Sequence, residues 1–208
     1  MQHTLPPVPT AAEQTLLDIA ALNRAGAPVV LRRLLPTDSM EELTDLLHRA
    51  YRPQVNMGLQ PLAGRQSPEV TRQRTSRGEC YVAVLGCAPA ERLVGVILFH
   101  EQEDAKGPPW FRRPDVDSFS QFAVEPSLQG RGIGRMLLQQ VELRALESGA
   151  RELGLSMAEP DTALMKFYER LGYRFIEHWQ WPYTNYRSAI LSKSLRPADG
   201  PEPVLPRP

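Results

Sequence analysis

The glycine-rich segment QGRGIG, from Gln129 to Gly134, carries the clearest chemical signal in this sequence. It follows a β-rich run at 119–124 and a break at Glu125-Pro126, and it opens a stretch with apolar residues at helical spacing, namely Ile133, Leu137, Leu138, Val141 and Ala145. The first N–H groups of a helix have no internal partner, and the helix dipole adds positive charge there. Because glycine lets the backbone approach a ligand closely, the segment predicts a phosphate or pyrophosphate site, with Arg131 and Arg135 as added cations.

Of three other interpretations of this segment, one stays open and the sequence excludes two. The glycines could simply make a strand–turn–helix connection, although glycine is costly at a helix start. A P-loop would need lysine and a hydroxyl residue at its end, and both are missing. A dinucleotide fingerprint that began at Gly130 would need glycine at position 135, which is arginine.

The segment resembles the acetyl-CoA loop of the GNAT N-acetyltransferase superfamily. The family pattern [QR]-x-x-G-x-[GA] is filled by Gln129, Gly132 and Gly134, and Val124-x-Pro126 precedes it at the usual offset. A second segment, FYERLGY at 167–173, looks like the family's FYEKLGF. The resemblance covers about residues 29–195, and the combination of the two motifs is specific.

The resemblance implies a cofactor site and a catalytic residue. Acetyl-CoA would bind at the end of the β-rich run, at the glycine loop and at the start of a later helix, that is, at Phe122, Ala123, Val124, Gln129, Gly130, Arg131, Gly132, Ile133, Gly134, Arg135 and Asp161. A backbone N–H near 122–124 would stabilise the oxyanion, and Tyr168 would protonate the departing CoA sulfur. Tyr168 could instead be an aromatic residue that fills the core. The family often has asparagine where this chain has Asp161, which caps a helix equally well but cannot donate hydrogen bonds when ionised.

A free amine would attack the thioester directly, so a group must first take up the proton of the ammonium. The sequence does not single out this base. The carboxylates and the hydroxyl near the expected strand ends are Glu101, Glu103, Asp117, Ser118 and Glu159, and the weaker candidates are His100 and His178. No His, Cys or carboxylate cluster has the spacing of metal ligands, so we expect no metal.

The elements expected around these motifs form an α+β fold. We expect helices at 10–23, from 40 to about 50, at 69–77 and at 162–171, strands at 29–34 and 152–157, and hairpins at 80–100 and 174–192. We expect Pro36-Thr37-Asp38-Ser39 and Asp161 to cap helices, residues 51–66 to be irregular, and Tyr51, Met57, Leu59 and Leu62 to line the acceptor site or pack as loop residues. The proline-containing insertion at 106–117 is either a lid or a surface loop. The resemblance implies a mixed, mostly antiparallel sheet with helices on both faces and splayed central strands.

Composition limits the function classes. The chain has 208 residues and zero net charge, so nothing favours nucleic acid or an acidic membrane surface as partner. The two cysteines, Cys80 and Cys87, are too few for a disulfide framework, and we expect them to be buried or inert thiols. No signal peptide or membrane span is visible, so we expect a cytoplasmic protein, a monomer or homodimer. We expect a helical extension at 1–27, one domain at 28–195 and a disordered proline-rich tail at 196–208.

Two function classes follow from the resemblance. The first is an N-acetyltransferase that uses acetyl-CoA and a primary amine of a small molecule, peptide or protein. The neutral charge balance does not distinguish a polyamine, an antibiotic, an amino acid or a protein as acceptor. The second class is a non-catalytic acyl-CoA-binding regulatory module that retains the loop.

Overall fold

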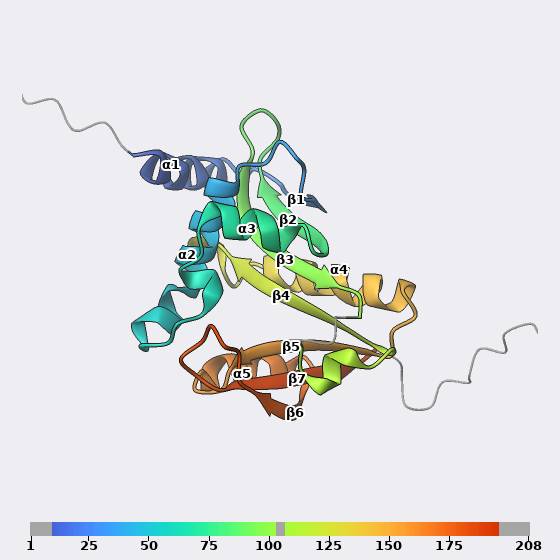
Figure 1. Ribbon diagram of the computed structural model, residues 1–208. Helices are drawn as coiled ribbons and strands as arrows, with labels where there is room; N and C mark the ends of the chain where they lie inside the picture. Colours follow the sequence, from blue (N-terminus) through green and yellow to red (C-terminus); the bar gives the residue numbers. More distant parts are fainter. Residues whose placement is uncertain (1–9, 103–106, 196–208) are drawn as a thin grey trace, which may run out of the picture.

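The computed structural model describes residues 10–102 and 107–195 and shows one twisted sheet with helices on both faces (Figure 1). The strands are β1 (Val29–Arg33), β2 (Glu79–Leu85), β3 (Arg92–His100), β4 (Val116–Val124), β5 (Glu152–Ala158), β6 (Arg174–Trp179) and β7 (Ser188–Ser194). They lie in the order β1-β2-β3-β4-β5-β7-β6, and every neighbouring pair is antiparallel except β4 and β5, which are parallel. The predicted mixed, mostly antiparallel sheet is confirmed.

The helices divide the hydrophobic core into two main clusters, one on each face of the sheet. They are α1 (Ala11–Arg24), α2 (Met40–Asn56), α3 (Pro68–Thr75), α4 (Ile133–Glu147) and α5 (Thr162–Arg170). Strand β2 shows the division, because its side chains alternate between faces. Tyr81, Ala83 and Leu85 join the cluster that includes residues of α1, α4 and α5, whereas Cys80 and Val82 join the cluster that includes residues of α2. Both faces of the sheet are therefore covered, as predicted.

Local capping signals position the helix ends. Thr10 and Glu13 form a capping box at the start of α1, Ser39 caps α2, and Asp161 caps α5. Glycines with left-handed φ follow three helices, at Gly26 (+68°), Gly149 (+90°) and Gly172 (+89°). The caps predicted within residues 36–39 and at Asp161 are confirmed. All five residues predicted for the apolar face of α4 are buried, namely Ile133, Leu137, Leu138, Val141 and Ala145.

The prediction that residues 51–66 are irregular was wrong for its first part, because α2 continues through Pro53 to Asn56. Proline lacks one N–H donor and usually ends a helix. Here tertiary contacts hold the last turn: Tyr51 packs against the cluster beneath α2, and the side chain of Gln54 donates a hydrogen bond to Asp161 Oδ2 at 3.1 Å. The chain leaves the helix at Gly58, whose φ is +79°.

The insertion at 106–117 is not a plain surface loop where the structure describes it. Residues 109–112 form a short 3-10 turn, and Phe111 is only 3% exposed. The ring of Phe111 lies over Gly154 of β5, where an added Cβ would stand 2.6 Å from it. Strand β4 also begins earlier than predicted, at Val116, because this packing extends the sheet toward the insertion.

The central strands separate part-way along their length, as the resemblance implied. β4 and β5 pair from Val116↔Glu152 to Phe119↔Leu155, and no further pair follows toward their carboxyl ends. Next to the point of separation, Gln121 has a φ of +50°, and the register between β3 and β4 shifts between Val96 and Leu98. The far halves of β4 and β5 are thus free to line a cleft.

Several other predictions have separate outcomes. Cys80 is buried, whereas Cys87 is exposed, so the expectation of a buried thiol holds for the first only. Within the described ranges, no helix is long and apolar enough to cross a membrane, and no group of three potential ligands could hold a metal. The proline-rich tail, residues 1–9 and Glu103 lie outside the described residues. The domain boundaries at 27/28 and 195/196 stay predictions.

Candidate active site

The glycine loop leaves the start of α4 open. Gly132 is the N-cap residue with a φ of +86°, and no side chain caps the helix. Gly130 is also left-handed, with a φ of +77°. The N–H groups of the first turn therefore have no intrahelical partner and carry the positive end of the helix dipole. This arrangement suits an anionic phosphate group.

The loop is fixed against the end of β4. Gln129 Nε2 donates a hydrogen bond to the carbonyl oxygen of Val124 at 3.2 Å. Gly134 lies against Phe122, where an added Cβ would stand 3.1 Å from the ring. Gly134 thus allows the helix start and the strand end to come close, which is a physical reason for glycine at this position.

A cavity of about 440 Å³ runs from this loop into the gap between β4 and β5. It is lined by most of the predicted cofactor residues and by the predicted donor, namely Phe122, Ala123, Val124, Gln129, Gly130, Ile133, Gly134, Asp161 and Tyr168. Three predicted cofactor residues do not line it: Arg131, Gly132 and Arg135. The side chain of Arg131 turns to α1 and donates a hydrogen bond to Asn23, and Arg135 is exposed. We refer to this space as the cofactor cavity.

Both carboxylate oxygens of Asp161 are occupied within the fold. Oδ1 accepts the N–H of Leu164 at 3.0 Å, and Oδ2 accepts Gln54 Nε2 at 3.1 Å. Asp161 therefore caps α5 and ties it to the end of α2. Its contribution at the cavity wall is that of an acceptor, because an ionised carboxylate has no hydrogen to donate.

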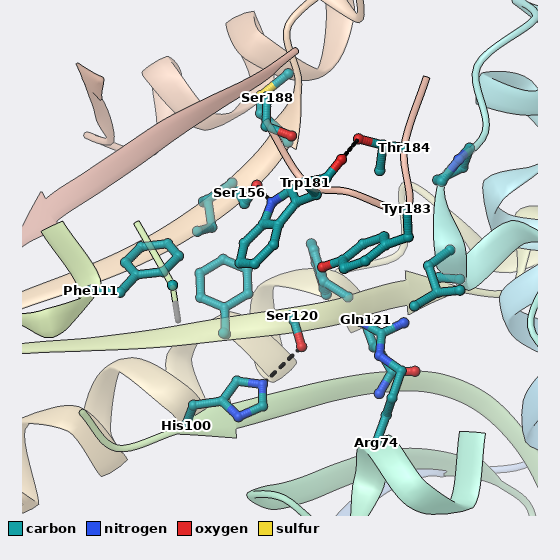
Figure 2. Close-up of a pocket in the computed structure, with 18 of the residues that line it drawn as sticks. Arg74, His100, Phe111, Ser120, Gln121, Ser156, Trp181, Tyr183, Thr184 and Ser188 are labelled. Atoms are coloured by element: carbon teal, nitrogen blue, oxygen red, sulfur yellow. Dashed lines mark hydrogen bonds between the residues drawn. The ribbon is translucent and has the colours of Figure 1, made fainter. Parts of the chain in front are cut away.

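A second cavity, of about 580 Å³, lies on the other side of the split, and we call it the acceptor pocket (Figure 2). Arg74, His100, Ser120 and Gln121 are on the side formed by α3, β3 and β4. Figure 2 shows Trp181 and Tyr183 across from them. The two cavities share lining residues, namely Tyr51, Phe122, Ser156, Met157, Tyr168 and Tyr186, so they meet at the split.

Tyr168 lies where the two cavities meet. Its side chain is 4% exposed and packs among Phe119, Phe167 and Tyr173, with ring centroids 5.3–6.3 Å apart. Burial raises the pKa of Tyr168 well above 10, with smaller contributions from Tyr51 and Asp161. The phenol therefore stays protonated at neutral pH and is available as a proton donor. The ring of Tyr168 also belongs to the hydrophobic core, in agreement with the alternative of a core aromatic, so its role as a donor stays a prediction.

The candidate carboxylate bases lie in different surroundings. Glu101 lines the acceptor pocket, and its carboxylate pairs with Arg144 of α4. Asp117 is buried and accepts a hydrogen bond from Ser148 past the end of α4, away from either cavity lining. Glu159 pairs with Arg187 at 2.7 Å, which lowers the pKa of Glu159. Of these three, only Glu101 reaches the pocket.

The other base candidates are also distinguished by the structure. His100 lines the acceptor pocket, with Nε2 2.9 Å from Ser120 Oγ. Burial, assisted by the charge of Arg74, lowers the pKa of His100 to about 4, so its imidazole is neutral at pH 7. Ser118 is buried beside these residues but lines neither cavity, and His178 is exposed beside Glu159.

The acceptor pocket contains residues that sequence reasoning missed. Among the predicted lining residues, Tyr51 and Leu62 contribute, whereas Leu59 does not and Met57 is 51% exposed. The polar and aromatic side chains that dominate the pocket come from other segments, namely Arg74, Arg77, Ser120, Gln121, Trp181, Tyr183 and Tyr186. The aromatic run in the turn between β6 and β7 was a usable signal, because large aromatic rings in a connecting loop commonly contact another surface.

Comparison with known proteins identifies the family. The sequence matches the Acetyltransferase (GNAT) family over residues 40–173. It is 27% identical over 146 residues to an S-(2-succino)cysteine N-acetyltransferase of Bacillus subtilis (strain 168), covering 68% of this chain and 82% of the relative.

Solved structures share the fold. The putative acetyltransferase yncA of Salmonella typhimurium with its cofactor acetyl-CoA has a TM-score of 0.57 and 16% identity, covering 85% of this chain and 99% of that one. The ribosomal-protein-S18-alanine N-acetyltransferase of Escherichia coli has a TM-score of 0.58 and 16% identity, covering 82% and 96%. Because the family match spans more than half of the sequence, this chain belongs to the Acetyltransferase (GNAT) family.

Proposed function

We propose that this protein transfers an acetyl group from acetyl-CoA to a primary amine by direct attack. The observation that carries the proposal is the split between β4 and β5, which connects the open start of α4 with a separate pocket and has Tyr168 at the junction. The related proteins act on amines of different kinds, a modified cysteine in one case and a ribosomal protein in another. The acceptor is therefore a small-molecule or peptide amine.

The cofactor cavity fits acetyl-CoA. Gly130 and Gly132 leave the backbone of the loop accessible, and the uncapped N–H groups of α4 would hold the diphosphate. The cavity then passes along Phe122 to Val124 toward Tyr168. Arg135, which is exposed beside the loop, adds charge for phosphate groups at its rim. Arg131, whose side chain contacts Asn23, acts through its backbone N–H.

The reaction requires three proton movements. The ammonium first loses a proton, because only the free amine is nucleophilic and a lysine-type amine has a pKa near 10.4. The nitrogen then forms a bond to the thioester carbon, the carbon–sulfur bond breaks, and the nitrogen loses a second proton. The thiolate takes up a proton, so the products are the N-acetyl amine, CoA with a free thiol and one proton released to solvent.

The end of β4 supplies the group that stabilises the oxyanion. β4 pairs with β3 on one side, through Ala123↔Val96 and Val124↔Gly95, but has no partner on the β5 side beyond Phe119. In a strand paired on one side, alternate N–H groups point away from the neighbouring strand. An N–H in 122–124 that points into the split can therefore donate a hydrogen bond to the developing oxyanion.

Tyr168 acts as the acid that protonates the departing sulfur. Its phenol borders both cavities and is protonated at neutral pH. The first proton of the amine leaves toward Glu101, which reaches the acceptor pocket, or through water. His100 is a poor acceptor for that proton, because its pKa of about 4 makes the imidazolium unfavourable.

Two measurements test the proposed function. Titration calorimetry with acetyl-CoA should show binding, and release of free CoA should depend on an amine when a panel of amino acids, polyamines, aminoglycosides and peptides is screened. Absence of acetyl-CoA binding would refute the assignment of the cofactor cavity. Binding without amine-dependent release on any member of the panel would instead favour the non-catalytic acyl-CoA-binding module.

A further inference from the structure

A chain of hydrogen bonds beneath the acceptor pocket has a fixed direction. Arg74 Nη1 donates to Gln66 Oε1 at 2.6 Å, and Gln66 Nε2 donates to Gln121 Oε1 at 2.9 Å and to Thr71 Oγ1 at 2.7 Å. A guanidinium group only donates, so the oxygen of Gln66 must face Arg74 and its NH₂ group must face Gln121. The oxygen of Gln121 is then used by Gln66. We call Arg74, Gln66 and Gln121 the amide chain.

The amide chain ends in an unused donor at the pocket. Gln121 is 3% exposed and lines the acceptor pocket, and its Nε2 has no hydrogen-bond partner among the described residues. Rotating the amide of Gln121 would place two NH₂ groups against each other, so the network itself excludes the opposite orientation. A buried donor without an acceptor costs about 1–3 kcal/mol. The same residue has a φ of +50°, which adds backbone strain. A ligand oxygen would remove the first of these costs.

The charges around the pocket favour an anion as the source of that oxygen. Arg74 and Arg77 both line the pocket, and the positive charge of each lowers the pKa of His100, although burial has the larger effect and a backbone hydrogen bond with Arg77 acts in the opposite direction. Glu101 also lines the pocket, and its carboxylate pairs with Arg144, which it shares with Glu79. The potential at His100 is therefore positive, and a bound carboxylate would be stabilised by it.

The opposite wall provides an apolar surface. Trp181 and Tyr183 stack at 5.5 Å with an interplanar angle of 21°, and Trp181 Nε1 donates a hydrogen bond to Ser156 Oγ at 2.9 Å. This hydrogen bond holds the indole ring next to the point where the split begins, because Ser156 directly follows Leu155, the last residue of β5 that pairs with β4. Figure 2 shows the two rings facing the side that carries Gln121 and Arg74. A ligand that fills the pocket would thus present an anionic group to one wall and an apolar part to the other.

We propose that the acceptor is an amino acid, or a derivative that keeps a free carboxylate near its amine, and that Gln121 Nε2 binds this carboxylate. Gln121 is adjacent in sequence to Phe122, where the acetyl group would lie, so the carboxylate and the reacting nitrogen belong close together in the ligand. Gln66 and Arg74 are positioning residues that orient the amide. This proposal rests on the proposed function and specifies its acceptor.

The test compares matched amines. CoA release is measured for several L-amino acids with apolar side chains and for the corresponding amino acid amides, in which an uncharged carboxamide replaces the carboxylate. For the wild-type protein, we expect kcat/KM to be roughly ten- to a hundredfold higher for the acid than for the amide. This ratio is the usual effect of losing a hydrogen bond to a charged group. The same pair of ligands is also measured by calorimetry in the presence of CoA.

Two substitutions at the amide chain and one control complete the test. Gln121→Met removes the donor at similar volume and should abolish the preference for the acid. Gln121→Glu replaces the donor by a charge and should reverse it, and neither change should alter the KM for acetyl-CoA. Arg72→Gln is the control, because Arg72 lies on the same helix as Arg74 but its side chain is 59% exposed and pairs with Glu69.

The outcomes separate this proposal from the proposed function. Equal turnover of acids and amides would overturn the carboxylate site while leaving the acetyltransferase intact. If no amine is turned over, calorimetry still decides: tighter binding of the acid that depends on Gln121 supports the site, and equal or absent binding overturns it. A preference for the acid that survives both Gln121 substitutions would also contradict the role of Gln121.

Discussion

Replacement of Tyr168 by phenylalanine tests the proposed chemistry most directly. The substitution removes one hydroxyl and keeps the ring that packs against Phe119, Phe167 and Tyr173. The free energy of unfolding should therefore change by no more than about 1 kcal/mol, the usual net value of one hydrogen bond. Any larger fall in activity must then come from loss of the proton donor.

The size of the effect follows from the acidity of the two groups. A thiol has a reference pKa near 8.5 and a phenol one near 10, so transfer from Tyr168 to a thiolate is uphill by about 2 kcal/mol before burial is counted. Burial raises the pKa of Tyr168 further. A general acid typically contributes about 10²–10⁴-fold, so a donor this weak belongs at the lower part of that range. We expect kcat to fall roughly ten- to a thousandfold.

Tyr173→Phe is the matched control. Tyr173 is 2% exposed and belongs to the same aromatic group, but its hydroxyl donates a hydrogen bond to Glu142 at 3.5 Å and lies outside both cavities. The assay is CoA release at saturating acetyl-CoA and amine, with urea unfolding of each variant. An unchanged kcat for Tyr168→Phe would remove the hydroxyl from the mechanism. Equal losses in both variants would show that the aromatic packing, and not the donor, was being measured.

Three further predictions concern the loop, a buried ion pair and a histidine. Gly132→Ala places a side chain on a left-handed residue that has no steric contact, which adds backbone strain of about 1–2 kcal/mol. This strain should raise the KM for acetyl-CoA roughly five- to thirtyfold. Gly149→Ala is the control, because Gly149 is equally left-handed at the other end of α4, and it should not change this KM. In the wild-type protein, Arg49 lies 2.9 Å from the buried carboxylate of Glu125. Glu125→Ala removes this partner, so the free energy of unfolding measured in urea should fall by about 3–5 kcal/mol. The pKa of His100 is about 4 in the folded protein and 6.5 in its ordinary range. Between these limits the unfolded chain binds a proton that the folded chain does not, so stability falls as the pH falls. Compared with His100→Asn, the wild-type protein should lose about 3 kcal/mol more stability between pH 6.5 and 4, and parallel pH curves would refute the lowered pKa.

Features encoded by neighbouring residues could be predicted from the sequence. The apolar face of α4, the caps at Ser39 and Asp161, and the order of strand, glycine loop and helix depend on residues within a few positions of one another. Propensity and spacing act over the same short distances. The predicted elements are confirmed, and most of the residues predicted to bind the cofactor line one cavity, because that cavity is built around one such segment. Their role in cofactor binding stays a prediction.

Features set by distant contacts could not be predicted. The extension of α2 through Pro53 depends on the hydrogen bond between Gln54 and Asp161, which are far apart in sequence. The burial of Phe111 depends on Gly154. From the local sequence, a proline in a helix and an aromatic ring in a proline-rich insertion both predict a loop. Tertiary packing instead continues the helix in the first case and buries the ring in the second.

The amide chain of the acceptor pocket was the hardest part to predict because its three residues carry no local signal. Gln66 lies in a loop, Arg74 on α3 and Gln121 within a strand. A glutamine in a β-rich run does not indicate a binding site. The sequence also gives no sign that a residue other than glycine will adopt a left-handed φ. The polarity of the amide chain becomes visible only when the three side chains are brought together.

The distortion at Gln121 connects the two halves of the site. β4 begins its parallel pairing with β5 at Val116 and ends it at Phe119, and the shift of register against β3 falls directly after this point. A bulge bends the strand that contains it and increases its local twist, so it turns β4 away from β5 and makes room between them. The same left-handed residue lines the acceptor pocket and directly precedes residues 122–124, where we propose that an N–H faces the split. One strained position would therefore account for the opening through which the thioester reaches the amine, for the donor that holds the amine's carboxylate, and for the N–H groups that meet the oxyanion.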